Sequence, residues 1–239
     1  MYKKGKYLET DKMSDLICEN YPMLLVMSRF GIALGFGDKN IGDVCRQNNV
    51  NAKTFLTVAN FLASEVTAPI EDIMKSISVD SLIIYLHNSH DYFLRFKLPG
   101  IRSKLMEAIS DSSKDVTFVI QKFFDEYANE VNKHMQYEEK VVFPYVKALV
   151  KGVKDPKYNI SIFIKRHDQI ELKIIELKNI LIKYYPGTTN GAANNLLNSV
   201  LFDIFSMEED LSFHNELEDS LFIPIIQRME KQLGLNDKH

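Results

Sequence analysis

The chain has 239 residues, of which 46% are hydrophobic and 26% charged, with only ten glycines and seven prolines. This composition is typical of a helical protein with a sizeable core. A net charge of −3 gives no drive toward nucleic acid or an anionic membrane, so we expect neither as a partner. No apolar segment follows the basic N-terminus and no apolar run could span a bilayer, so we expect a cytoplasmic protein. Cys18 and Cys45 lack a C-x-x-C spacing, which excludes the usual thiolate metal sites.

Residues 1–65 predict a small helical domain. Pro22 sits where one helix would begin, Gly31 would end it, and Asn51 can cap another. The expected short helices cover residues 14–18, 23–30, 41–47 and 51–63. They are too short to be stable alone and must pack on one another. Residues 66–77 then read as a linker.

Residues 78–239 predict a four-helix bundle. Apolar residues recur there at spacings of three and four, which is typical of amphipathic helices. The expected helices cover residues 79–109, 115–150, 158–184 and 192–231. Short connections between long helices favour an antiparallel up-down arrangement. Pro99, Pro144 and Pro224 fall inside these helices and should disturb them. The expected fold class is therefore all-α.

An internal repeat links the second and fourth long helices. The segment from His134 to Pro144 aligns without gaps to the segment from His214 to Pro224. Both copies read His-x3-Glu-acidic, then an apolar run, with proline ten residues after the histidine. The bundle therefore looks like two related pairs of helices.

The candidate metal ligands are four histidines, one on each long helix, and two glutamates. Each glutamate follows a histidine by four residues, so each pair shares a helix face. Buried imidazoles and carboxylates are costly unless they are paired or bind a cation. Histidine and carboxylate without thiolate favour iron, with manganese as the other suitable ion. The histidines and glutamates concerned are His90, His134, His167, His214, Glu138 and Glu218.

Two alternatives concern the choice of ligand. His87 lies three residues before His90 and could take its place, and Asp219 competes with Glu218. A single His-x3-Glu pair could also be a solvated intrahelical contact, and a helical bundle without metal is the plainest alternative. Two such pairs in a gap-free repeat favour the metal interpretation.

Two bridging carboxylates and two histidines per ion would fill four positions on each of two six-coordinate ions. An oxo or hydroxo bridge would fill a fifth. One position per ion would stay open for a small ligand such as dioxygen, peroxide or nitric oxide.

These motifs resemble the hemerythrin-like domains of the repair-of-iron-centres di-iron proteins. The resemblance is carried by residues 90–95, 134–144 and 166–168, by His214-x3-Glu218, and in the N-terminal region by residues 29–32. It implies two iron ions held by His90, His134, Glu138, His167, His214 and Glu218, and leaves His87 as a pocket residue. It also implies a role in iron–sulfur cluster repair under nitrosative or oxidative stress, with an iron–sulfur protein as partner.

One departure affects this expectation. The family's N-terminal domain carries an adjacent Cys-Cys pair where this chain has Gly35 and Phe36. The leading hypothesis is a di-iron protein that binds or reduces small oxidants. The alternatives are an oxygen or nitric oxide sensor that acts through a regulatory partner, and a dioxygen carrier.

Overall fold

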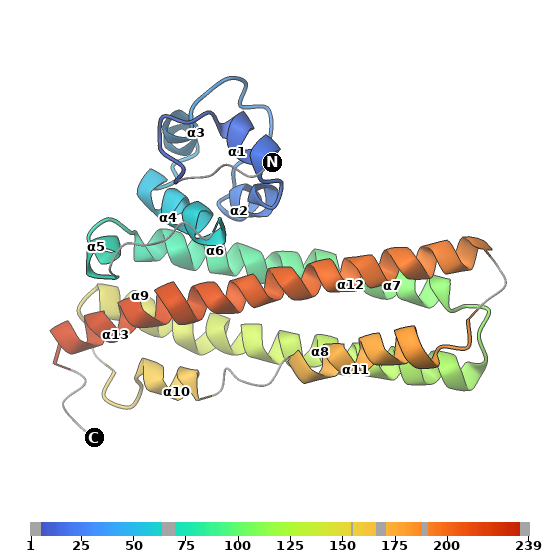
Figure 1. Ribbon diagram of the computed structural model, residues 1–239. Helices are drawn as coiled ribbons and strands as arrows, with labels where there is room; N and C mark the ends of the chain where they lie inside the picture. The colour runs from blue at the N-terminus through green and yellow to red at the C-terminus, as the bar shows by residue number, and fades with distance from the viewer. Residues whose placement is uncertain (1–5, 64–69, 154, 166–170, 188–190, 235–239) are drawn as a thin grey trace. The chain divides into compact units, whose positions relative to one another are not determined.

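A computed structural model describes residues 6–63, 70–153, 155–165, 171–187 and 191–234 (Figure 1). Within these ranges the chain forms helices and turns without a strand; Lys12 and Asn40 make one isolated bridge. The expected all-α fold is confirmed. None of the helices in these ranges combines the length and apolar character needed to cross a membrane.

The chain divides into two compact units. The first contains residues 1–89, 146–156 and 213–239, and the second contains residues 90–145 and 157–212. The predicted division into a domain of residues 1–65, a linker and a bundle of residues 78–239 is a different partition, and it stays a prediction.

Five short helices open the first unit. They are α1 (Met13–Glu19), α2 (Met23–Arg29), α3 (Ile41–Gln47), α4 (Ala52–Leu62) and α5 (Ile70–Met74). The first four agree closely with the predicted ranges, and Asn51 caps α4 as expected by accepting from the Thr54 N–H at 2.9 Å. Helix α5 lies in the stretch expected to be a linker. Helix α1 begins at Met13 because the Met13 N–H donates to the Lys39 carbonyl, a contact that sequence does not reveal.

Three of the long predicted helices are present within about two residues of their expected limits. The first consists of α6 (Val79–Asp91), η1 (Tyr92–Lys97) and α7 (Leu98–Ala108). The second consists of α8 (Lys114–Tyr137), η2 (Glu138–Val142) and α9 (Phe143–Val150). The fourth consists of α12 (Gly191–Leu217), η4 (Glu218–Phe222) and α13 (Ile223–Gln232). For the expected helix over 158–184, the described parts are α10 (Ile160–Ile164), α11 (Glu171–Asn179) and η3 (Ile180–Tyr184).

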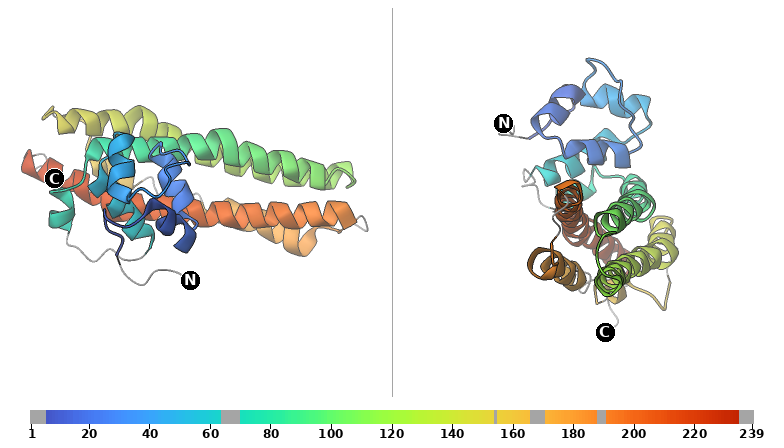
Figure 2. Two further views of the ribbon diagram at one scale, coloured as in Figure 1. Left: turned by 90° about the horizontal axis from the view of Figure 1, so that it is seen from above. Right: turned by 90° about the vertical axis from the view of Figure 1, so that its right-hand side faces the viewer.

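The second unit is a bundle with a continuous apolar core. Buried side chains from η1, α7, α8, α11, η3 and α12 form one cluster, to which Leu105, Phe124, Leu177 and Val200 each contribute with 1% exposure or less. Figure 2 shows these helices nearly end-on in its right-hand view. Burial of such side chains is the main source of stability in a bundle.

Ion pairs join each neighbouring pair of helices around this core. Arg102 of α7 bonds Asp125 of α8 at 2.7 Å, and Lys173 of α11 bonds Glu126 of α8 at 3.2 Å. The remaining pairs are Lys178 of α11 with Glu208 of α12, and Lys97 of η1 and Lys104 of α7 with Asp203 of α12. These contacts order the helices as a closed ring, so each helix lies beside its neighbour in sequence.

A π-helical turn precedes a proline in every long helix. The residue before each proline donates its N–H to the carbonyl five residues earlier. These bonds are Leu98 to Phe93, Phe143 to Glu138, Tyr185 to Ile180, and Ile223 to Glu218. A proline ring would clash with the carbonyl four residues back in a regular α-helix. The wider turn accommodates that ring, so the predicted disturbance by proline takes the form of a π turn.

Candidate metal centre

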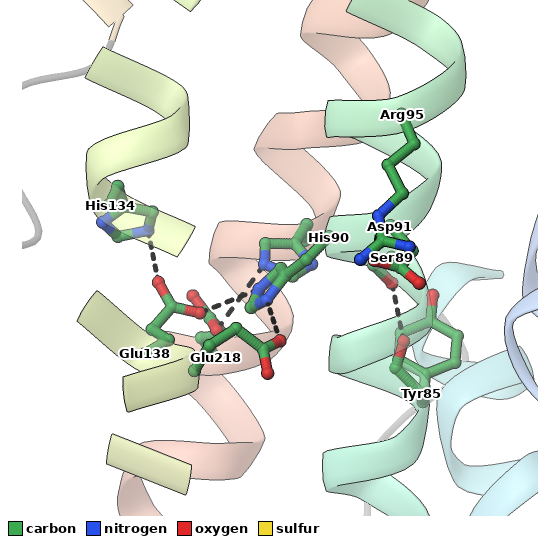
Figure 3. Close-up of polar contacts among 10 residues, drawn as sticks. Tyr85, Ser89, His90, Asp91, Arg95, His134, Glu138 and Glu218 are labelled. Atoms are coloured by element: carbon green, nitrogen blue, oxygen red, sulfur yellow. Dashed lines mark hydrogen bonds and ion pairs between the residues drawn. The ribbon is translucent and has the colours of Figure 1, made fainter. Parts of the chain in front are cut away.

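The first repeat copy places one buried carboxylate against two imidazoles (Figure 3). Glu138 is fully buried; its Oε2 lies 2.9 Å from Nε2 of His90, and its Oε1 lies 2.8 Å from Nε2 of His134. His90 is on α6 and His134 is on α8. Glu138 opens the π turn η2, so the wider turn that accommodates Pro144 also sets where this carboxylate projects. π turns of this kind are frequent at functional sites.

The second copy repeats the pattern with a looser contact. His214 and Glu218 are both fully buried, and Glu218 opens η4 as Glu138 opens η2. The His214 Nε2 lies 3.6 Å from the Glu218 Oε1, which is too long for a hydrogen bond.

Four of the predicted ligands present their ligand atoms to one another. His90, Glu138, His214 and Glu218 are all buried, and one ligand atom from each lies within 4.8 Å of the other three. Ligands at right angles around an ion, each about 2.1 Å away, are about 3 Å apart, and opposite ligands are about 4.2 Å apart. The four atoms, all within 4.8 Å of one another, are therefore close enough to share one cation after a small adjustment.

Glu139 fixes the orientation of the His90 ring. Its Oε1 lies 2.7 Å from the His90 Nδ1, so the Nδ1–H can donate to the carboxylate. The ring of Phe143 stacks on the His90 ring, with centroids 5.5 Å apart and an angle of 6° between the planes. A neutral imidazole with its proton on Nδ1 has its lone pair on Nε2, which is the atom that faces Glu138. A carboxylate on the far nitrogen is the usual support for a metal-binding histidine.

The Glu138 carboxyl is held ionised. In the metal-free site, burial is the largest influence and raises its pKa, but the positive charges of His90 and His134 and their hydrogen bonds outweigh burial. The pKa of Glu138 is therefore well below its usual value. An ionised carboxylate is the form that binds a metal. The neutral form of His90, with its lone pair on Nε2, is the form that a bound cation would require.

The structure separates the alternatives left open by the sequence. His87 is exposed, whereas His90 is 2% exposed, so His90 rather than His87 belongs to the buried cluster. A role for His87 in the pocket stays a prediction. The two residues lie on adjacent parts of one helix, and packing turns only His90 inward. Asp219 is exposed, whereas Glu218 is fully buried. His167 lies outside the described residues, so the complete six-residue ligand set stays a prediction.

The fold and this cluster define a helical bundle with a histidine and carboxylate site able to hold a cation. The Hemerythrin HHE cation binding domain matches residues 81–226, more than half of the chain. The protein belongs to this family. Comparison with curated proteins and with solved structures gave no match. The finer resemblance to repair-of-iron-centres proteins is not shown by this match and stays a prediction.

Glu139 is the functional residue that sequence reasoning missed. The repeat did show an acidic residue after each glutamate, as Glu139 and Asp219. Nothing in the sequence distinguished the two, because the partner of Glu139 comes from another helix. The signal in the sequence was the acidic residue that follows the glutamate in both copies of the repeat, which favours a role for both positions.

Proposed function

We propose that the protein is a di-iron protein that binds or reduces small oxidants. One ion would be held by His90, His214 and one oxygen from each of Glu138 and Glu218. The second ion would be held by His134, by the other carboxylate oxygens and, from the family resemblance, by His167. Manganese is the other ion that this donor set suits.

The position of Glu138 carries this proposal. Its two oxygens face different histidines, with Oε2 toward His90 and Oε1 toward His134. His90 belongs to the group of four that is close enough to share one cation, and His134 does not. A carboxylate whose two oxygens face two different imidazoles is suited to bridge two ions. Glu218 occupies the corresponding place in the repeat and would supply the second bridge.

The protein side chains would hold and insulate the metal pair. When bound, two ferrous ions supply electrons and an open coordination position for a small oxidant. Glu139 keeps the proton of His90 on Nδ1, and Phe143 covers one face of the ring. Full burial of Glu138, His214 and Glu218 restricts water, which strengthens every charge interaction in the site.

Cluster repair is the narrower function that the resemblance suggests, with an iron–sulfur protein as the partner. The cysteines of the N-terminal region do not supply a thiol pair, because Cys18 is exposed and Cys45 is buried. Burial, followed by the charge of Glu9, raises the pKa of the Cys45 thiol to about 12. That thiol stays protonated and a poor nucleophile. Any repair would therefore depend on iron from the metal pair.

Metal analysis and an absorption spectrum test the proposal. Protein purified from iron-supplemented cells should contain about two irons per chain and show oxo-bridge absorption. The double variant His134→Ala, His214→Ala should lose both. His87→Ala is the matched control, because His87 is an exposed histidine one turn before His90 on α6. Iron that is absent from the wild-type protein, or retained by the double variant, would overturn the proposal.

A sensor function is the second candidate, and two contacts between α2 and α6 favour it. The side chain of Asn88 donates to the Arg29 carbonyl at 2.7 Å, and Arg29 Nη1 lies 3.5 Å from the Tyr85 hydroxyl. Arg29 ends α2, while Tyr85 and Asn88 are on α6, the helix that carries His90. A ligand-dependent shift of α6 could thus reach the N-terminal helices and a regulatory partner. Hydrogen exchange in residues 23–29 should then change when nitric oxide is added to iron-loaded protein. Unchanged exchange would count against a sensor.

A further inference from the structure

A continuous series of aromatic side chains begins at His134. The His134 ring stacks on Phe163 with centroids 6.2 Å apart, and Phe163 stacks on Tyr137 at 6.4 Å. The hydroxyl oxygen of Tyr137 lies 3.4 Å from that of Tyr158, and the Tyr158 ring packs edge-on against Tyr145 at 4.8 Å. Short contacts between rings are the arrangement that favours electron transfer, and tyrosine is an oxidisable side chain.

The internal repeat shows that packing alone does not require a tyrosine at this position. Tyr137 directly precedes Glu138 in the first copy, and Leu217 directly precedes Glu218 in the second. Leu217 is fully buried, so an aliphatic side chain fills the corresponding place. His90 stacks on Phe143 and His134 stacks on Phe163, so a phenylalanine ring lies beside each imidazole. Beyond Phe163 the series continues to Tyr137, so the path to a tyrosine leaves the site on the His134 side.

We propose that Tyr137, Tyr158 and Tyr145 form a one-electron relay for the metal pair, with Tyr137 as its first donor. This inference rests on the proposed function, because the relay needs an oxidant at the metal pair. Tyr137 and Tyr158 are half-buried and Tyr145 is 7% exposed. The half-buried rings give the relay an exit to solvent, whereas Glu138, His214 and Glu218 are fully buried.

The relay would act when peroxide reacts at a metal pair that can supply only one electron. Peroxide needs two electrons and two protons to become two waters. A bound metal pair in this state would supply one of the two electrons. Tyr137 supplies the second electron together with its phenolic proton, and solvent supplies the other proton. The products are two waters, a ferric ion and a neutral tyrosyl radical at Tyr137.

The radical then moves along the ring contacts and is quenched at the surface. Tyr158 transfers an electron and a proton to Tyr137, and its half-buried ring is reached by a low-molecular-weight thiol. The thiol gives up a hydrogen atom, which restores tyrosine and leaves a thiyl radical. The relay thus removes an oxidising equivalent that would otherwise attack His134 or Glu138.

Electron paramagnetic resonance tests the relay. Iron-loaded protein poised with one ferrous and one ferric ion is mixed with hydrogen peroxide, frozen, and examined for a tyrosyl radical. Tyr137→Phe keeps the ring contact with Phe163 and should lower the radical signal at least tenfold while iron content stays at the wild-type value. Tyr184→Phe is the control, because Tyr184 is 76% exposed, and should leave the signal unchanged.

The outcomes separate the relay from the metal centre on which it depends. Iron that binds normally together with a full radical signal in Tyr137→Phe, or no radical in the wild-type protein, would overturn the relay alone. Wild-type protein without iron would overturn both proposals. Peptide mapping gives a second readout that does not rely on a spectrum: oxidised tyrosine should accumulate at Tyr137 and Tyr158 and be absent at Tyr184.

Discussion

The apolar core of the second unit and the histidine and glutamate cluster are equally buried, but burial has opposite energetic consequences in the two regions. In the core, Leu105, Phe124 and Val200 gain free energy when they leave water. In the cluster, Glu138 and Glu218 lose hydration, and each carboxylate adds charge near the other. The core therefore stabilises the fold without any ligand, whereas the two carboxylates of the cluster lie close together and carry like charges that a bound cation would offset. Buried like charges gathered at one place are typical of a binding site.

The largest expected effect comes from a cavity in the apolar core. Phe124 is 1% exposed, and Phe124→Ala should lower the free energy of unfolding by about 3–5 kcal/mol, because apolar contacts are lost and a cavity remains. Chemical denaturation measures the loss. Iron bound per folded chain should stay at the wild-type value, since Phe124 is not a ligand. A fall in iron per folded chain would show that the two regions are not independent.

A change in the cluster should have the opposite sign in the absence of metal. Glu218→Gln removes one of two nearby buried carboxylates, so the metal-free protein should gain about 1 kcal/mol or more. The iron-loaded protein should lose stability, because a bridging ligand is gone. Paired unfolding curves with and without iron measure both effects. A metal-free variant that is clearly less stable than wild type would contradict the contrast between the two regions.

The support of His90 by Glu139 should affect metal affinity rather than folding. Glu139→Gln weakens the acceptor for the Nδ1–H of His90, and the loss of such a support typically lowers metal affinity about 10- to 100-fold. Competition with a chelator measures the affinity, and thermal unfolding of the metal-free protein serves as the control. Glu130→Gln changes an acid of α8, the helix that η2 continues. Glu130 pairs with Lys133 instead of a histidine, so this variant should leave affinity unchanged. Equal losses of metal affinity in both variants would show that Glu139 acts only through its charge and not through its bond to His90.

The smallest expected effect concerns the ion pairs around the core. Burial raises the pKa of Asp203, but hydrogen bonds and charges from Lys104 and Lys97 outweigh it, so the pKa lies below its usual value. A lowered pKa means that Asp203 adds stability above its unfolded pKa of about 3.9, and that this is lost as pH falls through the folded value. Asp203→Asn should therefore cost roughly 1–2 kcal/mol at pH 7 and less at pH 3, where the contribution of the ionised carboxylate is declining. Urea unfolding at both pH values measures it; an equal cost at both would exclude the ion pairs as its source.

Local sequence patterns were sufficient to predict the all-α fold class and to single out the histidines and glutamates that cluster in the structure. Helical periodicity, helix caps and the His-x3-Glu spacing are local properties, so they can be recognised without knowing what surrounds each helix. The gap-free repeat added long-range information, because two copies of one motif imply two equivalent places in a fold. That is why the long helices and the pairing of Glu138 with Glu218 could be predicted.

The choice between residues that are close or equivalent in sequence depends on tertiary contacts. His87 and His90 are both on α6, and contact with Glu138 and Glu139 selects His90. The acids after the two glutamates are alike in sequence, yet Glu139 bonds a histidine and Asp219 is exposed. The π turns and the aromatic series from His134 likewise depend on contacts that a linear pattern cannot show. In each case a partner on another helix, or the widened turn before a proline, determines which residue reaches the site. These contacts depend on how the helices pack, which a linear pattern does not encode.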